Sequence, residues 1–158
     1  MSRLHRYATT LRWTGNRGTG TSAYAAYGRD HEVEADGRPD LALTSDPAFR
    51  GDPARWNPEL LLLASLSSCH QLWYLHLCAE AGIAVLAYED RAEAVMEEEA
   101  SGAGRFVEAI LRPVVTIAPG NDAARAAALH RDAGAKCFIA RSMNFPVRHE
   151  PEIFGSPA

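Results

Sequence analysis

A long apolar stretch in the middle of the chain constrains its fold more than any other feature. Asn57 is a good N-cap, Pro58 suits the first helical position and Gly82 is a natural C-terminal stop, so the sequence predicts a helix over residues 57–82. A helix of about 25 residues is about 37 Å long, close to the diameter expected for a compact domain of this size. Because this helix is apolar nearly all round, one small sheet would not cover it, and we expect a second copy of the chain to do so.

The flanking segments predict an α+β fold with antiparallel pairing in a single domain over residues 1–158. Before the helix, strands are expected within residues 8–36, and a loop rich in proline is expected over residues 37–56. The predicted strands are Leu11–Thr14, Thr21–Tyr27 and His31–Ala35. After the helix we expect a hairpin over 85–117, a helix over 121–133, and a segment over 136–151 that holds Cys137 and the last strand.

Composition excludes several classes of function. A net charge of -4 on 158 residues gives no electrostatic footprint for nucleic acid. The apolar run near Leu60 is interrupted by Ser, Cys, His and Gln, so no membrane span is expected, and residues 1–20 lack the apolar stretch of a signal peptide. Three cysteines are too few for a secreted disulfide scaffold, so we expect a reducing compartment, the cytoplasm.

Two of the three cysteines are candidates for redox chemistry. Cys69 follows the leucine run of the helix, and Cys137 lies in a second helical pattern. A cysteine attacks only as the thiolate, so it needs a group that holds the anion. Glu59 precedes Cys69 by ten positions, about 15 Å along a regular helix. For the two to cooperate, the carboxylate must come from a partner chain, or the helix must break near Leu61.

The third cysteine and the nearby histidines have simpler interpretations. Cys78 lies about 180° around the helix from Cys69, so we interpret it as a packing thiol. With His70 and His76 these cysteines are the side-chain types that bind zinc. Their spacing scatters them around the helix axis, so no metal site is expected.

Several stretches together resemble the OsmC family, which includes the organic hydroperoxide resistance proteins. The family carries an Arg-Gly-x-Gly-Thr turn, an Asn-Pro-Glu helix start followed by Ala-x-Cys, and a second thiol further on. The corresponding residues of this chain are Arg17-Gly18-Thr19-Gly20-Thr21, Trp56-Asn57-Pro58-Glu59-Leu60, Ala64-Ser65-Leu66-Ser67-Ser68-Cys69-His70 and Cys137.

This resemblance implies an OsmC-like intertwined homodimer, with antiparallel β-sheets wrapped around long central helices and active sites at the subunit interface. It also implies a thiol-dependent peroxidase that reduces organic hydroperoxides. Cys69 would be the peroxidatic thiolate, Arg17 and Glu59 its activating pair, and Cys137 the resolving thiol. The family implies no bound cofactor, only an external dithiol reductant of the dihydrolipoyl type.

Alternatives remain within this resemblance. Arg29 is a rival to Arg17 as the activating guanidinium. Redox-active members often have Cys-Pro-x-Ser at the second thiol, where this chain has the segment Cys137-Phe138-Ile139-Ala140. The alternative function is therefore a non-catalytic OsmC-like dimer that binds a small apolar ligand in its interface pocket. For the peroxidase, a pocket formed by the leucines and by Trp56 or Trp73 would favour alkyl hydroperoxides over hydrogen peroxide.

Overall fold

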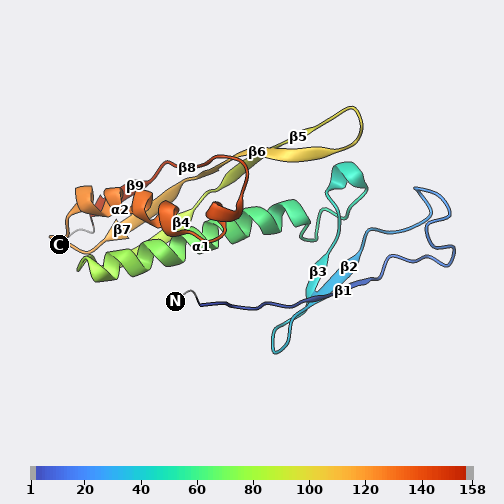
Figure 1. Cartoon of the computed structure of the whole chain (residues 1–158), viewed down its shortest axis with the longest axis horizontal. Helices are drawn as coiled ribbons and strands as arrows, with labels where there is room; N and C mark the ends of the chain where they lie inside the picture. Colours follow the sequence, from blue (N-terminus) through green and yellow to red (C-terminus); the bar gives the residue numbers. More distant parts are fainter. Residues whose placement is uncertain (1–2, 156–158) are drawn as a thin grey trace. The chain divides into compact units, whose positions relative to one another are not determined.

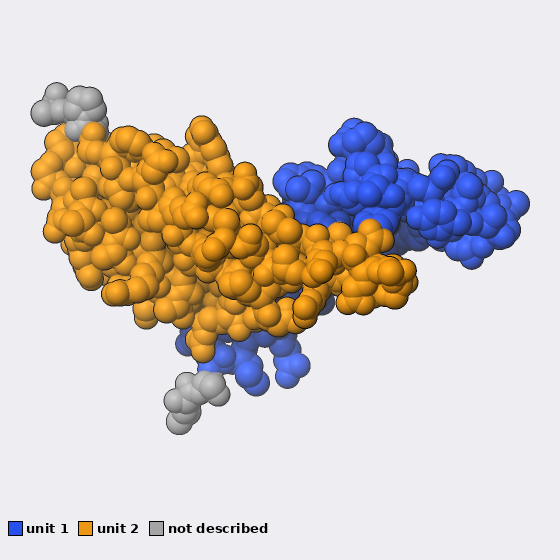
Figure 2. All heavy atoms as spheres, turned by 90° about the horizontal axis from the view of Figure 1, so that it is seen from above, with its two compact units in different colours: residues 1–61 blue, residues 62–158 orange. Residues whose placement is uncertain are grey.

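The computed structural model describes residues 3–155. Two helices and three sheets confirm the α+β class. The chain divides into two compact units, unit 1 (residues 1–61) and unit 2 (residues 62–158), which Figure 2 colours separately. The division falls within the long helix α1 (Pro58–Glu80), and the single domain over residues 1–158 stays a prediction.

Unit 1 contains a three-stranded antiparallel sheet in the order β1-β2-β3. Its strands are β1 (Thr10–Trp13), β2 (His31–Glu34) and β3 (Leu41–Leu43). The strand predicted over Thr21–Tyr27 is wrong, because these residues form turns and bends. The loop closes at its base, where the Gly28 amide donates to the Gly15 carbonyl at 2.8 Å. A Cβ on Gly15 would lie 2.0 Å from the Gly28 carbonyl oxygen, so this crossing requires glycine.

The loop predicted over residues 37–56 is wrong in part. It contains β3 and a 3-10 helix, η1 (Pro47–Phe49). Asp46 caps η1 by accepting from the Ala48 amide at 2.8 Å, and Pro47 occupies its first turn. An aspartate cap followed by proline is typical of the start of a helix, but the same residues are also common in turns, so the sequence did not indicate η1.

The capping residues fix the ends of α1 much as the sequence predicts. The Asn57 side-chain oxygen accepts from the Leu60 amide at 2.8 Å, as an N-cap does. At the other end Gly82 has φ of +71°, and the Ile83 amide donates to the Cys78 carbonyl at 2.9 Å, forming a Schellman motif. Within residues 3–155, neither helix combines the length and the hydropathy that crossing a membrane would require.

Unit 2 confirms the hairpin over residues 85–117, which divides between two sheets (Figure 1). Its four strands are β4 (Val85–Asp90), β5 (Glu93–Glu98), β6 (Gly104–Leu111) and β7 (Pro113–Ile117). β4 pairs with β7, and β5 pairs with β6. The two arms of the hairpin pass from one sheet to the other at Arg91 and at Arg112. Pro113, which has no amide hydrogen, is the first residue of β7.

The C-terminal strands correct the expectation of purely antiparallel sheets. β8 (Val147–His149) pairs parallel with β6, and β9 (Glu152–Gly155) pairs parallel with β7. The two sheets of unit 2 are therefore mixed, in the orders β4-β7-β9 and β5-β6-β8. Helix α2 (Ala123–Lys136) precedes both strands and returns the chain, so that they run in the same direction as the hairpin's second arm. The last strand of the prediction corresponds to β8, and β9 was not predicted.

The core of unit 2 lies between the two helices and the sheet of β4, β7 and β9. The fully buried face of α1 recurs every four residues and consists of Leu66, His70, Tyr74 and Cys78. Asp122 caps α2 by accepting from the Arg125 amide at 2.9 Å. The helix extends to Lys136, three residues beyond the predicted end, and the predicted helix from Cys137 is a 3-10 turn, η2 (Ala140–Ser142). The buried core residues are Tyr74, Cys78, Ile83, Val115, Ile117, Ala126, Leu129 and Ala133.

Candidate functional site

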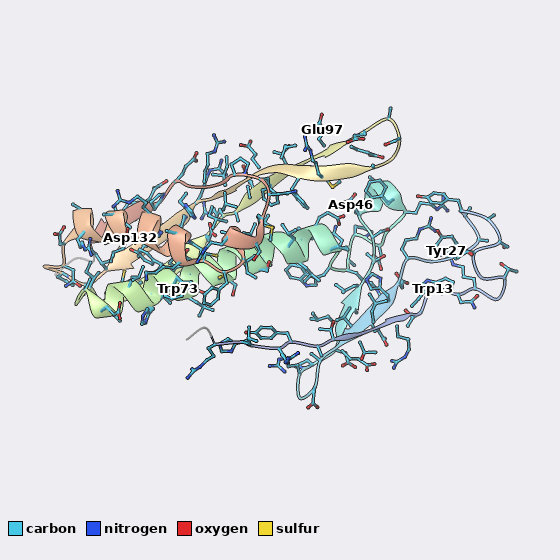
Figure 3. The ribbon with its side chains drawn as sticks, in the orientation of Figure 1. Trp13, Tyr27, Asp46, Trp73, Glu97 and Asp132 are labelled. Atoms are coloured by element: carbon cyan, nitrogen blue, oxygen red, sulfur yellow. The ribbon has the colours of Figure 1, made fainter. Side chains whose placement is uncertain are left out.

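A second face of α1, different from the core face, lines an apolar cavity in unit 2 of about 550 Å³. Its helix positions recur at three and four residues, which places them on one side of α1. Trp73, labelled in Figure 3, projects from this face, and two residues after α2 complete the wall. The lining residues are Ser65, Ser68, Cys69, Leu72, Trp73, His76, Phe138 and Ile139.

The structure brings the two candidate thiols together. Cys69 lies on the cavity face and is partly exposed, whereas Cys137 is the C-cap of α2 and is buried. The two side chains lie close enough for Cys69 to raise the pKa of Cys137, and both thiols are free. The Ala140 amide donates to Cys137 Sγ at 3.4 Å, which holds the second sulfur from the side of η2.

The environment of Cys137 favours its protonated form. Burial raises the pKa of this thiol to about 11, and the neighbouring Cys69 adds to the increase. The backbone amides of Ala140 and Ile139 act in the opposite direction, because they stabilise the anion. At neutral pH Cys137 is therefore a protonated thiol, whose S–H group can act as a hydrogen-bond donor toward Cys69, the accessible sulfur of the pair.

Two aromatic rings form one corner of the cavity. The rings of Trp73 and Phe138 are 5.5 Å apart with planes at 84°, an edge-to-face arrangement. The ammonium of Lys136 lies 5.5 Å from the centre of the Trp73 ring. The sequence indicated a pocket of the leucines with Trp56 or Trp73, and of these Leu72 and Trp73 line the cavity whereas Trp56 does not. It did not indicate Ser68, or Ser65, whose offset of four from Cys69 places it beside that thiol on the helix.

Arg17 lies in unit 1, in the glycine-rich turn that the sequence singles out. Asn16 organises this turn by accepting from the Gly18 amide at 2.9 Å and from the Gly20 amide at 3.1 Å. The Arg17 side chain is exposed, and among residues 3–155 it makes neither a hydrogen bond nor an ion pair. Its guanidinium is therefore available to a ligand or to another chain.

Arg29, the rival guanidinium, is already engaged within unit 1. It lies over the rings of Tyr24 and Tyr27, at 4.3 and 4.1 Å, and donates to the Tyr27 carbonyl at 2.7 Å. Tyr27 in turn packs against Trp13, with ring centroids 5.9 Å apart. Figure 3 labels both residues. These contacts engage one face of the Arg29 guanidinium, whereas its Nη2 atom is buried and has no hydrogen-bond partner among the described residues. Arg17 and Arg29 therefore both stay candidates for the activating guanidinium.

Glu59 lies in the first turn of α1, where a carboxylate complements the helix dipole. Its Oε2 atom is shielded from solvent and has no hydrogen-bond partner among the described residues. The helix continues regularly past Leu61, whose amide donates to the Asn57 carbonyl at 3.1 Å. Glu59 could act on Cys69 either from a partner chain or through a break in the helix near Leu61. The regular helix excludes the break.

The core face of α1 holds a cluster of three histidines. His70 Nε2 and His130 Nδ1 are 2.9 Å apart, and the His149 ring stacks on His70 at 4.2 Å. A Cβ on Gly134 would lie 2.6 Å from the His149 ring, so glycine within α2 makes room for this stack. Burial lowers the pKa of His70 to about 3 and that of His130 to about 4, so both are neutral at pH 7.

The residues considered as zinc ligands are divided between the two faces of α1. Cys69 and His76 face the cavity, whereas His70 and Cys78 are buried in the core. Over residues 3–155, no three His, Cys, Asp or Glu side chains converge in a way that could hold a metal ion. Cys78 packs beneath Tyr74, as expected of a packing thiol.

The structure thus brings an accessible thiol on α1 close to a buried thiol at the end of α2, within an α+β fold. The family model for OsmC-like proteins matches residues 51–152, so the chain belongs to this family. A comparison with curated proteins gave no significant match.

Solved structures share the fold. An OsmC-like protein of unknown function from Vibrio cholerae is 25% identical with a TM-score of 0.84, over 94% of this chain and 100% of that one. An organic hydroperoxide resistance protein from Elizabethkingia anophelis is 17% identical, with a TM-score of 0.70 over 99% and 100% of the chains. The organic hydroperoxide resistance protein OhrB of Bacillus subtilis is 21% identical, with a TM-score of 0.64 over 95% and 100%.

Proposed function

We propose that this protein is a thiol-dependent peroxidase that reduces organic hydroperoxides. The observation that carries the proposal is the proximity of an accessible thiol, Cys69, which lines an apolar cavity, and a buried thiol, Cys137. The names of the organic hydroperoxide resistance proteins that share the fold also support this class of substrate.

The proposed cycle has three steps. The Cys69 thiolate attacks the terminal peroxide oxygen, the O–O bond breaks, and the product alcohol takes up a proton, leaving a sulfenic acid on Cys69. The Cys137 sulfur then attacks this sulfenic sulfur, and a disulfide forms with release of water. A dithiol reductant, of the dihydrolipoyl type in our proposal, exchanges with the disulfide and restores both thiols while it is itself oxidised. We place this cycle in the cytoplasm, where reduced thiols are maintained.

The proposal includes a homodimer in which Arg17 and Glu59 act on Cys69 of the partner subunit. Because α1 is unbroken, Glu59 cannot reach the thiol ten residues away on its own helix. Arg17 has a free guanidinium, and Glu59 has an unpaired oxygen that such a fork would satisfy. Unit 1 also leaves large apolar side chains exposed, a feature of surfaces that bind another protein. These side chains are Leu11 at 62%, Leu41 at 44% and Trp56 at 51% exposure.

The direct test of the proposal is oxidation of the full-length protein with cumene hydroperoxide, followed by disulfide mapping. We expect one disulfide, between Cys69 and Cys137, with Cys78 still a free thiol. In Cys137→Ser the oxidation should stop at the sulfenic acid or continue to sulfinic acid, seen as added oxygen in the intact mass. Thiols that stay unchanged under oxidant would contradict the peroxidase and favour the alternative, a dimer that binds a small apolar ligand in this cavity of about 550 Å³.

A second test concerns Arg17. We expect Arg17→Ala to slow alkylation of Cys69 at neutral pH, because the thiolate loses its stabilising cation. Arg29→Ala is the matched control and should leave the alkylation rate unchanged. A slower rate in the control alone would assign the role to Arg29.

Mixed dimers separate activation within a chain from activation by the partner. A heterodimer of one Cys69→Ser chain and one Arg17→Ala chain, purified with two different tags, contains one site with both an intact thiol and the partner's intact arginine. We expect this heterodimer to recover about half of the wild-type peroxidase rate, although each parent homodimer is defective. Failure to recover activity, or a protein that sediments only as a monomer, would contradict the shared site.

A further inference from the structure

The corner formed by Trp73 and Phe138 points to a narrower class of substrate. Resting on the proposed function, we propose that this cavity selects aryl hydroperoxides, whose aromatic ring is attached to the carbon that bears the O–O–H group, over non-aromatic alkyl hydroperoxides. Phe138 and Trp73 are then the specificity-determining residues.

The spacing on α1 places an aromatic surface at the right distance from the thiol. Trp73 follows Cys69 by four residues, so the two Cβ atoms are about 5–6 Å apart on the same face. A substrate whose peroxide oxygen meets the Cys69 sulfur therefore has its next substituent beside the Trp73 ring. A ring attached to the carbon that bears the O–O–H group fits the distance between Cys69 and Trp73, whereas a ring at the end of a long chain would extend past Trp73.

The second ring makes the contact selective for aromatic groups. Trp73 and Phe138 meet at 84°, with centroids 5.5 Å apart, so a third ring in the corner can stack on one and meet the edge of the other. Aromatic rings prefer these two geometries because of their quadrupoles, and saturated groups of equal size gain nothing from them. The ammonium of Lys136, 5.5 Å from the Trp73 ring centre, supports this ring from outside the cavity lining.

The polar groups at the cavity offer little to a hydrophilic substrate. The Ser65 hydroxyl already donates to the Leu62 carbonyl at 2.7 Å, and His76 contacts Glu80 at 3.4 Å. Cys69 and Ser68 remain as the groups beside the O–O–H end of the substrate. The other lining residues stabilise a bound substrate by burying its apolar surface, and the aromatic residues among them determine which apolar group binds best.

The experiment compares two substrates of nearly the same shape. Cumene hydroperoxide carries a phenyl ring, and its saturated counterpart, 2-cyclohexylpropan-2-yl hydroperoxide, carries a cyclohexyl ring on the same carbon. In the wild-type protein with a dithiol reductant, we expect kcat/KM to be about fivefold to tenfold higher for the aromatic substrate, as two ring–ring contacts imply.

Variants at Phe138 test whether the Trp73–Phe138 corner causes the preference for the aromatic substrate. The Phe138 side chain is 67% exposed, so Phe138→Leu should fold normally and reduce the ratio of the two kcat/KM values to within about twofold of unity. Phe138→Tyr should keep the ratio. Phe145→Leu is the matched control, because Phe145 pairs with Phe106 outside the cavity lining, and it should also keep the ratio.

The outcomes distinguish this inference from the proposed function. Consumption of both hydroperoxides at equal kcat/KM by the wild-type protein would overturn the aryl preference and leave the peroxidase in place. A preference that survives in Phe138→Leu would overturn the assignment to this corner. Consumption of neither hydroperoxide, with the thiols unoxidised, would instead remove the peroxidase itself.

Discussion

Replacing Cys69 with serine is expected to reduce hydroperoxide consumption to the rate in buffer alone. A serine hydroxyl is not ionised near neutral pH, and oxygen is a far weaker nucleophile toward a peroxide than a thiolate sulfur. Because the Cys69 side chain is partly exposed at the cavity, the substitution leaves no buried gap, and the fold should be retained. The measurement is the loss of cumene hydroperoxide over time, with far-UV circular dichroism to verify the fold.

Cys78→Ala is the matched control for this loss. Cys78 is 1% exposed in the core beside Tyr74, so its truncation should lower the free energy of unfolding and leave the peroxidase rate unchanged. Loss of activity in this variant at a temperature where it remains folded would mean that Cys69 is not the only reactive thiol. Retained activity in Cys69→Ser would remove the proposed mechanism.

Features that depend on residues close in sequence could be predicted well. The ends of α1 follow from Asn57, Pro58 and Gly82, whose side chains and φ values act within one helical turn. The hairpin of β4 to β7 also follows from local alternation and a glycine turn. The error over Thr21–Tyr27 has a similar local origin, because aromatic and threonine residues favour a strand only where a neighbouring strand pairs with them.

Features that depend on distant residues could not be predicted. β8 and β9 are short, and their parallel pairing with β6 and β7 is determined by the path through α2 rather than by their own residues. His70 and His130 are sixty positions apart, so no spacing rule indicates that their rings meet. Cys69 and Cys137 are sixty-eight positions apart, and only the family resemblance paired these thiols in advance.

The buried histidine cluster predicts a steep loss of stability in acid. His70 is 0% and His130 2% exposed, and burial lowers their pKa values to about 3 and about 4 from the 6.5 expected of a free histidine. Burial also lowers the pKa of His149, against an opposing effect of Asp90. Between about pH 6.5 and pH 4 the unfolded chain therefore binds protons at His70 and His130 that the folded protein does not bind.

Because the unfolded chain binds more protons than the folded protein, the free energy of unfolding decreases as the pH is lowered. Stability is full above about pH 6.5 and falls as the pH decreases toward 4, by about 1.4 kcal/mol per pH unit for each of the two histidines. The combined loss over this range is comparable to the whole stability of an ordinary domain, about 5–15 kcal/mol. We expect the free energy of unfolding, measured with urea at pH 7, 6 and 5, to fall by about 1.4 kcal/mol between pH 7 and 6 and by about 2.4 kcal/mol between pH 6 and 5, because the unfolded histidines take up most of their protons below pH 6.5.

Two variants determine whether the cluster causes this slope. His130→Phe keeps a ring to stack on Tyr74, 3.7 Å from His130 in the native protein, and removes one titrating group, so the slope should decrease by about half. Because the slope is the readout, a lower overall stability of this variant does not obscure the result. His76→Gln, at an exposed position of the same helix, should leave the slope unchanged. A free energy of unfolding that stays constant from pH 7 to pH 5 would show that these imidazoles accept protons in the folded protein, which the stack of His149, His70 and His130 does not allow while it remains closed.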